Sequence, residues 1–240
     1  MDWYYVEDNI CIACADCRSI LPHLPKVDLV LTDPPYIHKK IYGGGLARKS
    51  CLYSERQLEG ISNFDFYAYI DLLLSAADFM VAFHSRDLIF HYASAAKQRG
   101  LKYDLHVWHK KNAIPFTANT WKSDIEYLAL VWSHKPGWVQ KQESEHSKVY
   151  KANIEINRYH PAQKPIPLLR KYIEILDADT VIDPFMGSGT TLVAAKQLGR
   201  KAIGIEIEER YCQIAVERLR QSVLPLNLQD EERQEQGDLI

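Results

Sequence analysis

The sequence predicts an α/β fold: a mostly parallel sheet with helices on both faces and an antiparallel hairpin at one edge. Strand-like apolar runs alternate with helical patterns along most of the 240 residues, which is typical of parallel sheets. Runs such as 79–83 are continuously apolar, as expected for strands buried on both sides. No helical pattern separates 105–108 from 127–132, and this predicts the hairpin.

The expected elements follow one another at intervals that suit this fold. Strands are expected at Asn9–Ala15, Asp28–Thr32, Phe79–Phe83, Leu105–Trp108, Tyr127–Trp132, Thr180–Ile182 and Lys201–Ile205. Helices are expected at Phe66–Ala77, Asp87–Arg99, Leu168–Leu176, Thr190–Leu198 and Glu208–Leu224. The polar segments 37–63 and 133–158 lack periodicity and are predicted to be long loops, functional or disordered.

Length and composition favour one domain, spanning residues 1–228, with an acidic tail at 229–240 that is expected to be disordered. Hydrophobic residues make up 47% and charged residues 25%, as in ordinary soluble proteins. No stretch approaches the ~18 apolar residues of a membrane span, and no signal-peptide pattern opens the chain. A cytoplasmic location is therefore expected, and the odd number of cysteines, five, agrees with a reducing compartment.

The cysteine spacing at the N-terminus is the one hint of a metal site. Cys11, Cys14 and Cys17 are three residues apart. A strand would place Cys11 and Cys14 on opposite faces, and no second Cys/His pair follows at zinc-finger spacing. We therefore predict no metal.

The distribution of charge is more informative than its total. The net charge is −2, but residues 37–171 carry +8 and the remainder carries −10. A basic middle can form a face that binds a polyanion. An ordinary solvated surface is the alternative.

The first chemical motif follows the strand at 180–182. Asp183 ends the strand, and Gly187 and Gly189 lead into a helix, whose N-terminal N–H groups can face a ligand. Glu206 follows the next strand, where a carboxylate can hold both hydroxyls of a ribose. This succession predicts a site for a nucleoside cofactor.

The residues between this strand and the two glycines indicate which cofactor binds. The third glycine of a dinucleotide fingerprint is missing, and Phe185 and Met186 add apolar bulk that suits S-adenosylmethionine better than a pyrophosphate. Upstream, Gln163 and Lys164 stand before the helix at Leu168, where they could bind a carboxylate. Simple capping of the helix is the alternative for these two.

The second motif, Asp33-Pro34-Pro35-Tyr36, ends the strand at 28–32. The two prolines remove backbone donors, so the Asp33 carboxylate and the Pro34 carbonyl remain as acceptors. An exocyclic amine has two hydrogens to donate to them, and Tyr36 could stack on the base. The motif predicts a pocket for a nucleobase amine, and a strand-ending turn without chemistry is the alternative.

On these motifs the chain resembles the permuted β-group of DNA amino-methyltransferases, which modify adenine or cytosine amines. The resemblance implies a Rossmann-like methyltransferase sheet with a circularly permuted motif order, since the amine motif precedes the cofactor motifs. It implies that Asp33, Pro34, Pro35 and Tyr36 hold the target base. Trp108–Asn112 and Ile125–Tyr127 resemble further motifs of the target side. It implies cofactor contacts by Asp16, His160, Gln163, Lys164, Asp183, Phe185, Gly187, Ser188, Gly189, Thr190 and Glu206.

The resemblance also implies double-stranded DNA as the partner, with the base flipped out of the helix. The segments at about 37–63 and 133–158 would contact DNA. The candidate DNA-binding cations are Lys39, Lys40, Arg48, Lys49, Lys110, Lys111, Lys141, Lys148 and Lys151. Members of the group often dimerise, so a second copy of the chain is a candidate partner.

The aspartate at position 33 favours adenine N6, because cytosine enzymes of this group more often carry serine there. The setting would be restriction–modification, a phage or an orphan enzyme. Cytosine N4, an RNA base or a protein amide are alternative substrates. A non-catalytic DNA- or nucleotide-binding module is the alternative from another class.

Overall fold

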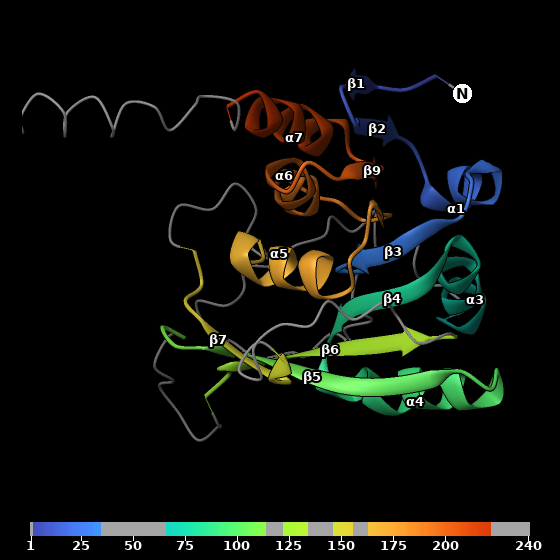
Figure 1. Ribbon diagram of the computed structural model, residues 1–240, viewed down its shortest axis with the longest axis vertical. Coiled ribbons are helices and arrows are strands. Elements are labelled where there is room, and N and C mark those ends of the chain that lie inside the picture. Colours follow the sequence, from blue (N-terminus) through green and yellow to red (C-terminus); the bar gives the residue numbers. More distant parts are fainter. Residues whose placement is uncertain (1, 35–65, 114–121, 134–145, 156–162, 222–240) are drawn as a thin grey trace, which may run out of the picture.

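A computed structural model of the chain describes residues 2–34, 66–113, 122–133, 146–155 and 163–221 (Figure 1). Within these residues nine strands form one sheet in the order β1-β2-β9-β8-β3-β4-β6-β5-β7. The strands are β1 (Tyr5–Glu7), β2 (Ile10–Cys14), β3 (Val27–Thr32), β4 (Ala77–His84), β5 (Lys102–Lys110), β6 (Ile125–Trp132), β7 (Val149–Ala152), β8 (Thr180–Asp183) and β9 (Lys201–Glu206).

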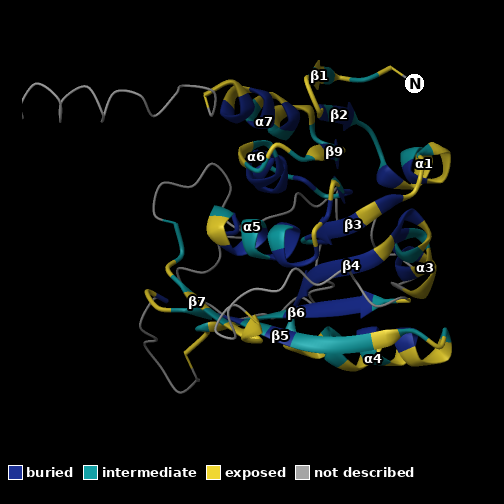
Figure 2. Ribbon diagram, in the orientation of Figure 1, coloured by how far each residue is buried: buried dark blue, intermediate teal, exposed yellow. Residues whose placement is uncertain are grey.

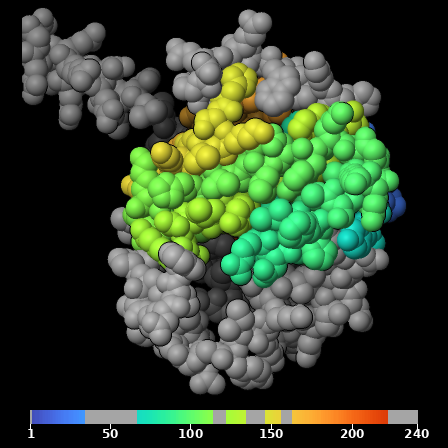
Figure 3. Space-filling view, turned by 90° about the horizontal axis from the view of Figure 1, so that it is seen from below, coloured from blue at the N-terminus to red at the C-terminus, as the bar shows by residue number. Residues whose placement is uncertain are grey.

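The centre of the sheet is parallel and its antiparallel pairings lie towards the edges. β2, β9, β8, β3 and β4 are parallel neighbours. β6 runs antiparallel to both β4 and β5, so the predicted hairpin of β5 and β6 is confirmed. β7 pairs with β5 and ends the sheet on that side. Residues of β5 (green) and α4 (teal) cover much of the face seen in Figure 3.

Helices cover both faces, as predicted, and each face has its own core (Figure 2). On one side lie α5 (Ile166–Ile175), α6 (Thr190–Gln197) and α7 (Glu209–Gln221). On the other lie α1 (Cys17–Ile20), α3 (Phe66–Ala76) and α4 (Ile89–Gln98). The short helices η1 (Leu21–His23) and η3 (Arg86–Leu88) adjoin α1 and α4.

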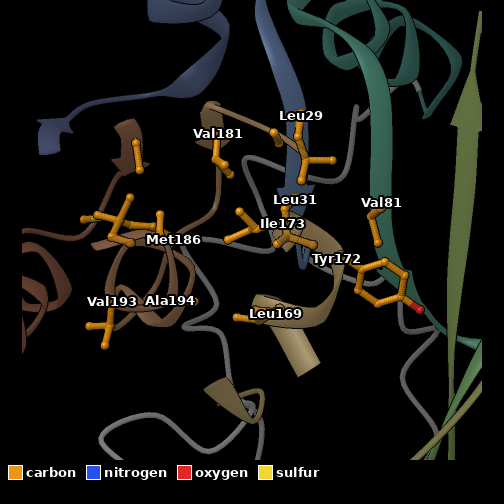
Figure 4. Packing of buried hydrophobic residues seen from close by; sticks show 14 of the residues in the cluster. Leu29, Leu31, Val81, Leu169, Tyr172, Ile173, Val181, Met186, Val193 and Ala194 are labelled. Atoms are coloured by element: carbon orange, nitrogen blue, oxygen red, sulfur yellow. The ribbon is translucent and has the colours of Figure 1, made fainter. Parts of the chain in front are cut away.

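The alternation of β3 shows why the strands are apolar throughout. Leu29 and Leu31 point into the core beneath α5, together with Val181 and Ile173, whereas Val30 packs under α3 and α4 (Figure 4). All three side chains of β3 are completely buried. A central strand covered on both sides is apolar in its middle, and the polar residues of β3, Asp28 and Thr32, stand near its two ends.

Three elements were not predicted. β1 and α1 are too short to produce a periodic pattern. β7 lies inside the segment 133–158, which was predicted to be a loop; that prediction is wrong at Val149–Ala152. β7 is a four-residue edge strand with exposed Val149 and Lys151, so its sequence is too short and too interrupted to show the apolar run of a buried strand.

No helix among the described residues is long and apolar enough to cross a membrane. The predicted tail, 229–240, and the whole of the segment 37–63 lie outside the described residues.

Candidate active site

The two chemical motifs meet where the strand order reverses. β3 continues through α3 to β4 on one side, and β8 continues through α6 to β9 on the other. Such a reversal leaves a crevice at the carboxyl ends of the two central strands, where α/β proteins bind ligands. The Thr32 hydroxyl donates a hydrogen bond to Asp183 Oδ1 at 2.8 Å, and so joins the ends of β3 and β8 directly.

Asp183 is the centre of this junction. Its Oδ1 also accepts the Phe185 backbone N–H at 3.1 Å, and its Oδ2 accepts the Thr191 hydroxyl at 2.6 Å. Burial raises the pKa of the Asp183 carboxyl to about 6, against these hydrogen bonds. Asp183 was predicted to contact the cofactor; in the structure its two oxygens hold the turn that begins α6.

The glycine turn passes close to α7. Gly187 and Gly189 have φ of 50° and 78°, the left-handed region that favours glycine. A Cβ on Gly189 would lie 2.7 Å from the Cβ of Ala215 in α7. The turn is also held from α7 by Arg218, whose guanidinium donates to the Ser188 carbonyl at 2.7 Å and to the hydroxyls of Ser188 and Thr190.

Glu206 stands at the carboxyl end of β9, across from this turn. Its Oε2 accepts the Gly187 N–H at 3.0 Å and its Oε1 accepts the Glu208 N–H at 2.9 Å. Burial raises the pKa of this carboxyl. Each carboxylate oxygen has a second lone pair, so the group fits the two hydroxyls of a ribose. The predicted cofactor carboxylate is therefore placed beside the glycine turn.

Asp16 lies one strand further along the same edge, just after β2, whose Cys14 pairs with Glu206. Its carboxylate caps α1 through the Arg18 N–H and also pairs with the Arg18 guanidinium. Its predicted contact with the cofactor's adenine stays a prediction.

Asp33 follows β3 and forms an ion pair that the sequence did not predict. Its Oδ2 lies 2.8 Å from Nζ of Lys164, whose ammonium also pairs with Glu126. Glu126 in turn accepts Lys110 Nζ at 2.8 Å. Lys164 was predicted to bind the cofactor, but its described partners are these two carboxylates. Gln163, its neighbour, pairs with Glu155.

The predicted DNA-binding cations divide into three groups. Lys110 is largely buried against Glu126, and Lys148 pairs with Asp104 at 2.7 Å. Lys111 and Lys151 are exposed near the carboxyl ends of β5 and β7, on the same edge as Asp33. The third group lies outside the described residues and consists of Lys39, Lys40, Arg48, Lys49 and Lys141. Three predicted residues of the base pocket and the cofactor site also lie outside them, namely Pro35, Tyr36 and His160.

Two structural contributors to the site were missed. Thr32 looks like the last residue of a buried strand, and only its contact with Asp183 reveals its role. Arg218 stands beside the buried face of α7, and a charge at such a position is the signal that could have identified it.

Two solved structures illustrate the similarity of this fold to known proteins. The M1.HpyAVI complex with SAM is 28% identical with a TM-score of 0.68, and covers 88% of this chain and 98% of its own. The PvuII DNA methyltransferase, described as cytosine-N4-specific, is 18% identical with a TM-score of 0.70 over 94% of this chain and 90% of its own, which supports the fold alone. Fold and site together define a Rossmann-like methyltransferase, as predicted.

The DNA methylase family matches residues 27–217, and the chain belongs to this family. A curated relative, the Type II methyltransferase M2.LlaDCHI of Lactococcus lactis subsp. cremoris, is 27% identical over 90% of this chain and 91% of its own length. The prediction of the DNA amino-methyltransferase family is therefore confirmed, and S-adenosylmethionine is confirmed as its cofactor.

Proposed function

We propose that the protein transfers a methyl group from S-adenosylmethionine to N6 of an adenine in double-stranded DNA, at a specific site. The observation that carries this proposal is the place of Asp33. Its carboxylate stands at the carboxyl end of β3, beside β8 and the glycine turn, and is paired with the ammonium of Lys164. An acceptor for an amine therefore adjoins the cofactor side of the crevice.

In this proposal the cofactor supplies an electrophilic methyl group on its sulfonium sulfur. Glu206 holds the ribose hydroxyls, and the N–H groups at the start of α6 face the crevice. Phe185 packs beside Tyr69, with ring centroids 5.3 Å apart, and adds apolar surface next to the turn. These residues fix the direction from which the base must approach.

Asp33 positions the amine and does not act as a base before transfer. An aromatic amine is too weak an acid for a carboxylate to deprotonate. The Asp33 carboxylate and the Pro34 carbonyl accept the two amine hydrogens, which localises the lone pair of the nitrogen towards the methyl group. On transfer, the N–CH₃ bond would form as the S–CH₃ bond breaks, the sulfur would be left as a neutral thioether, and the cationic nitrogen would then release one proton to water.

Adenine is preferred to cytosine because position 33 is Asp, in keeping with the motif of the adenine enzymes that the chain resembles. The base must leave the duplex to reach this edge, at a cost of a few kcal/mol. The exposed Lys111 and Lys151 would contact the phosphates on this edge. A Type II relative makes a restriction–modification setting the natural one.

The test is transfer of labelled methyl from S-adenosylmethionine to unmethylated genomic DNA, followed by separation of the nucleosides. We expect label in N6-methyl-2′-deoxyadenosine, and a fall of at least about 1000-fold with Asp33→Ala while the cofactor still binds. Asp78→Asn is the matched control, because Asp78 begins β4 at the opposite edge of the sheet.

Label in N4-methylcytosine would refute the base assignment and leave the roles of Asp33 and the cofactor intact. No label in DNA, with the cofactor bound, would refute the function and direct the search to RNA and protein amides. Loss of cofactor binding in a folded Asp33→Ala variant would refute the role of Asp33.

A further inference from the structure

Beyond the residues that face substrate or cofactor, a chain of four alternating charges lies behind the base pocket. Lys164 stands just before α5 and is only 7% exposed. Its ammonium bridges Asp33, at the end of β3, and Glu126, in β6. Lys110, in β5, pairs with Glu126 and is the last member of this series of charges. Residues from β5, β6 and the segment just before α5 are therefore linked, through Lys164, to Asp33 at the end of β3.

The burial of Lys164 depends on its partners. Burial alone would lower the pKa of its ammonium, but Asp33 and Glu126 raise it above the ordinary lysine value. Burial alone would raise the pKa of Glu126, but Lys164 and Lys110 lower it to about 2. The ring of Phe83 lies 4.9 Å from the Lys164 ammonium and adds a further favourable contact. Lys164 and Glu126 thus stabilise each other in their charged forms.

We propose that Lys164 is a positioning residue for methyl transfer: it holds the Asp33 carboxylate ionised and in one orientation, while Glu126 holds Lys164. The ion pair at Oδ2 removes the rotation of the carboxylate, so the amine meets an acceptor that is already placed. A protonated Asp33 would present a hydroxyl donor and could not accept the amine hydrogen in the same way.

The groups around Asp33 show why a counter-charge matters. Asp183 lies at the end of the neighbouring β8, and the negative charge of Asp33 contributes to raising its pKa. Tyr69 of α3 and Tyr92 of α4 also interact with Asp33, but burial raises the pKa of both phenols, so they stay neutral. Without Lys164, Asp33 would be a partly buried carboxylate beside a second one, an arrangement that favours protonation.

The proposal requires only methyl transfer to DNA and does not depend on which base receives the label. Total labelled methyl incorporated into DNA is therefore the readout, measured as a single-turnover rate between about pH 5 and 9. The variants are Lys164→Met, Lys164→Arg and Glu126→Gln in the full chain. Lys196→Met is the matched control, since Lys196 is a partly buried lysine paired with Glu7 at 2.6 Å on α6.

We expect Lys164→Met to lower the rate about 10- to 100-fold, to bind S-adenosylmethionine within about threefold of the wild type, and to move the acid limb of the pH profile upward by about one unit or more. If Lys164→Met shifts the acid limb equally when Asp183 is also replaced by Asn, the limb reports the titration of Asp33 and not of Asp183. Lys164→Arg keeps the charge, so it should restore part of the rate and leave the limb in place. Lys196→Met should change neither.

Glu126→Gln tests whether the acid limb of the pH profile responds in the opposite direction from Lys164→Met. It removes a negative charge behind Lys164, so the acid limb should move downward or stay in place, even if the rate falls. An upward shift in this variant would overturn the proposal. An unshifted profile in folded Lys164→Met would also overturn it.

Parallel loss of cofactor binding and rate in Lys164→Met would make Lys164 a cofactor ligand instead. If Lys164→Met does not fold, a shifted limb in Lys164→Arg would overturn the proposal in its place.

Discussion

The contact between the glycine turn and α7 gives a prediction that can be worked out from the structure. Gly189 has φ of 78°, and a Cβ on it would lie 2.7 Å from the Cβ and 3.3 Å from the Cα of Ala215. Ala215 is completely buried in α7, so neither group can turn away. The perturbation is Gly189→Ala, with Ala215→Gly as its partner in a double-mutant cycle.

Two separate costs are expected for Gly189→Ala. A left-handed backbone costs an alanine about 1 kcal/mol, and an overlap in a close-packed core costs roughly 1–3 kcal/mol. The free energy of unfolding should therefore fall by about 2–4 kcal/mol. Ala215→Gly removes the overlap and leaves the backbone cost, so the double variant should recover about 1–3 kcal/mol relative to additivity.

Urea unfolding of the four proteins and titration with S-adenosylmethionine measure the two consequences. The turn must shift to accommodate the methyl group, so Gly189→Ala should weaken cofactor binding about tenfold or more, and the second substitution should restore part of it. If the two substitutions are additive within about 0.5 kcal/mol, the turn does not rest on α7 and the reasoning fails.

Two further predictions concern charge. The folded-state pKa of Asp183 is about 6, above the ordinary value of 3.8, so the folded state binds this proton more tightly. The contribution of Asp183 to stability should fall by about 2 kcal/mol as the pH rises from 4 to 6; Asp183→Asn should flatten that step in the urea midpoint, and a persisting step would assign it to another group. Replacing both Lys111 and Lys151 by alanine should lower the slope of log affinity for DNA against log salt by up to about 2. Replacing Lys102 and Lys201, which begin β5 and β9 at the opposite edge, should leave the slope unchanged.

The fold was largely predictable because a central strand has to be apolar along its whole length. Apolar runs in the sequence identify β3, β4 and β8, and the helices between these strands explain why they pair in parallel. β7 was not predictable, since an edge strand with one neighbour needs no apolar run. Periodicity reports burial, so it misses elements that are only half covered.

The site was predictable in its ligand-facing residues and less so in what supports them. Asp33, Asp183 and Glu206 stand at strand ends, and sequence alone places strand ends on one edge. The pairing of Lys164 with Asp33 joins residues 131 positions apart, and nothing in either motif indicates it. From the sequence, Lys164 before the helix was open to two interpretations, a ligand for the cofactor or a cap of the helix, and the first of these stays a prediction. Only the fold shows that it faces a neighbouring carboxylate.

The strand order has a consequence for how the enzyme is made. Thr32 and Asp183, the two residues that join the motifs, are separated by 151 positions, so β3 can pair with β4 but lacks its second neighbour until β8 has been synthesised. Glu206 and Arg218 come later still. A nascent or truncated chain can present the amine motif but has no cradle for the cofactor, and such distant pairings fold slowly. Methylation capacity therefore appears only when almost the entire chain has left the ribosome.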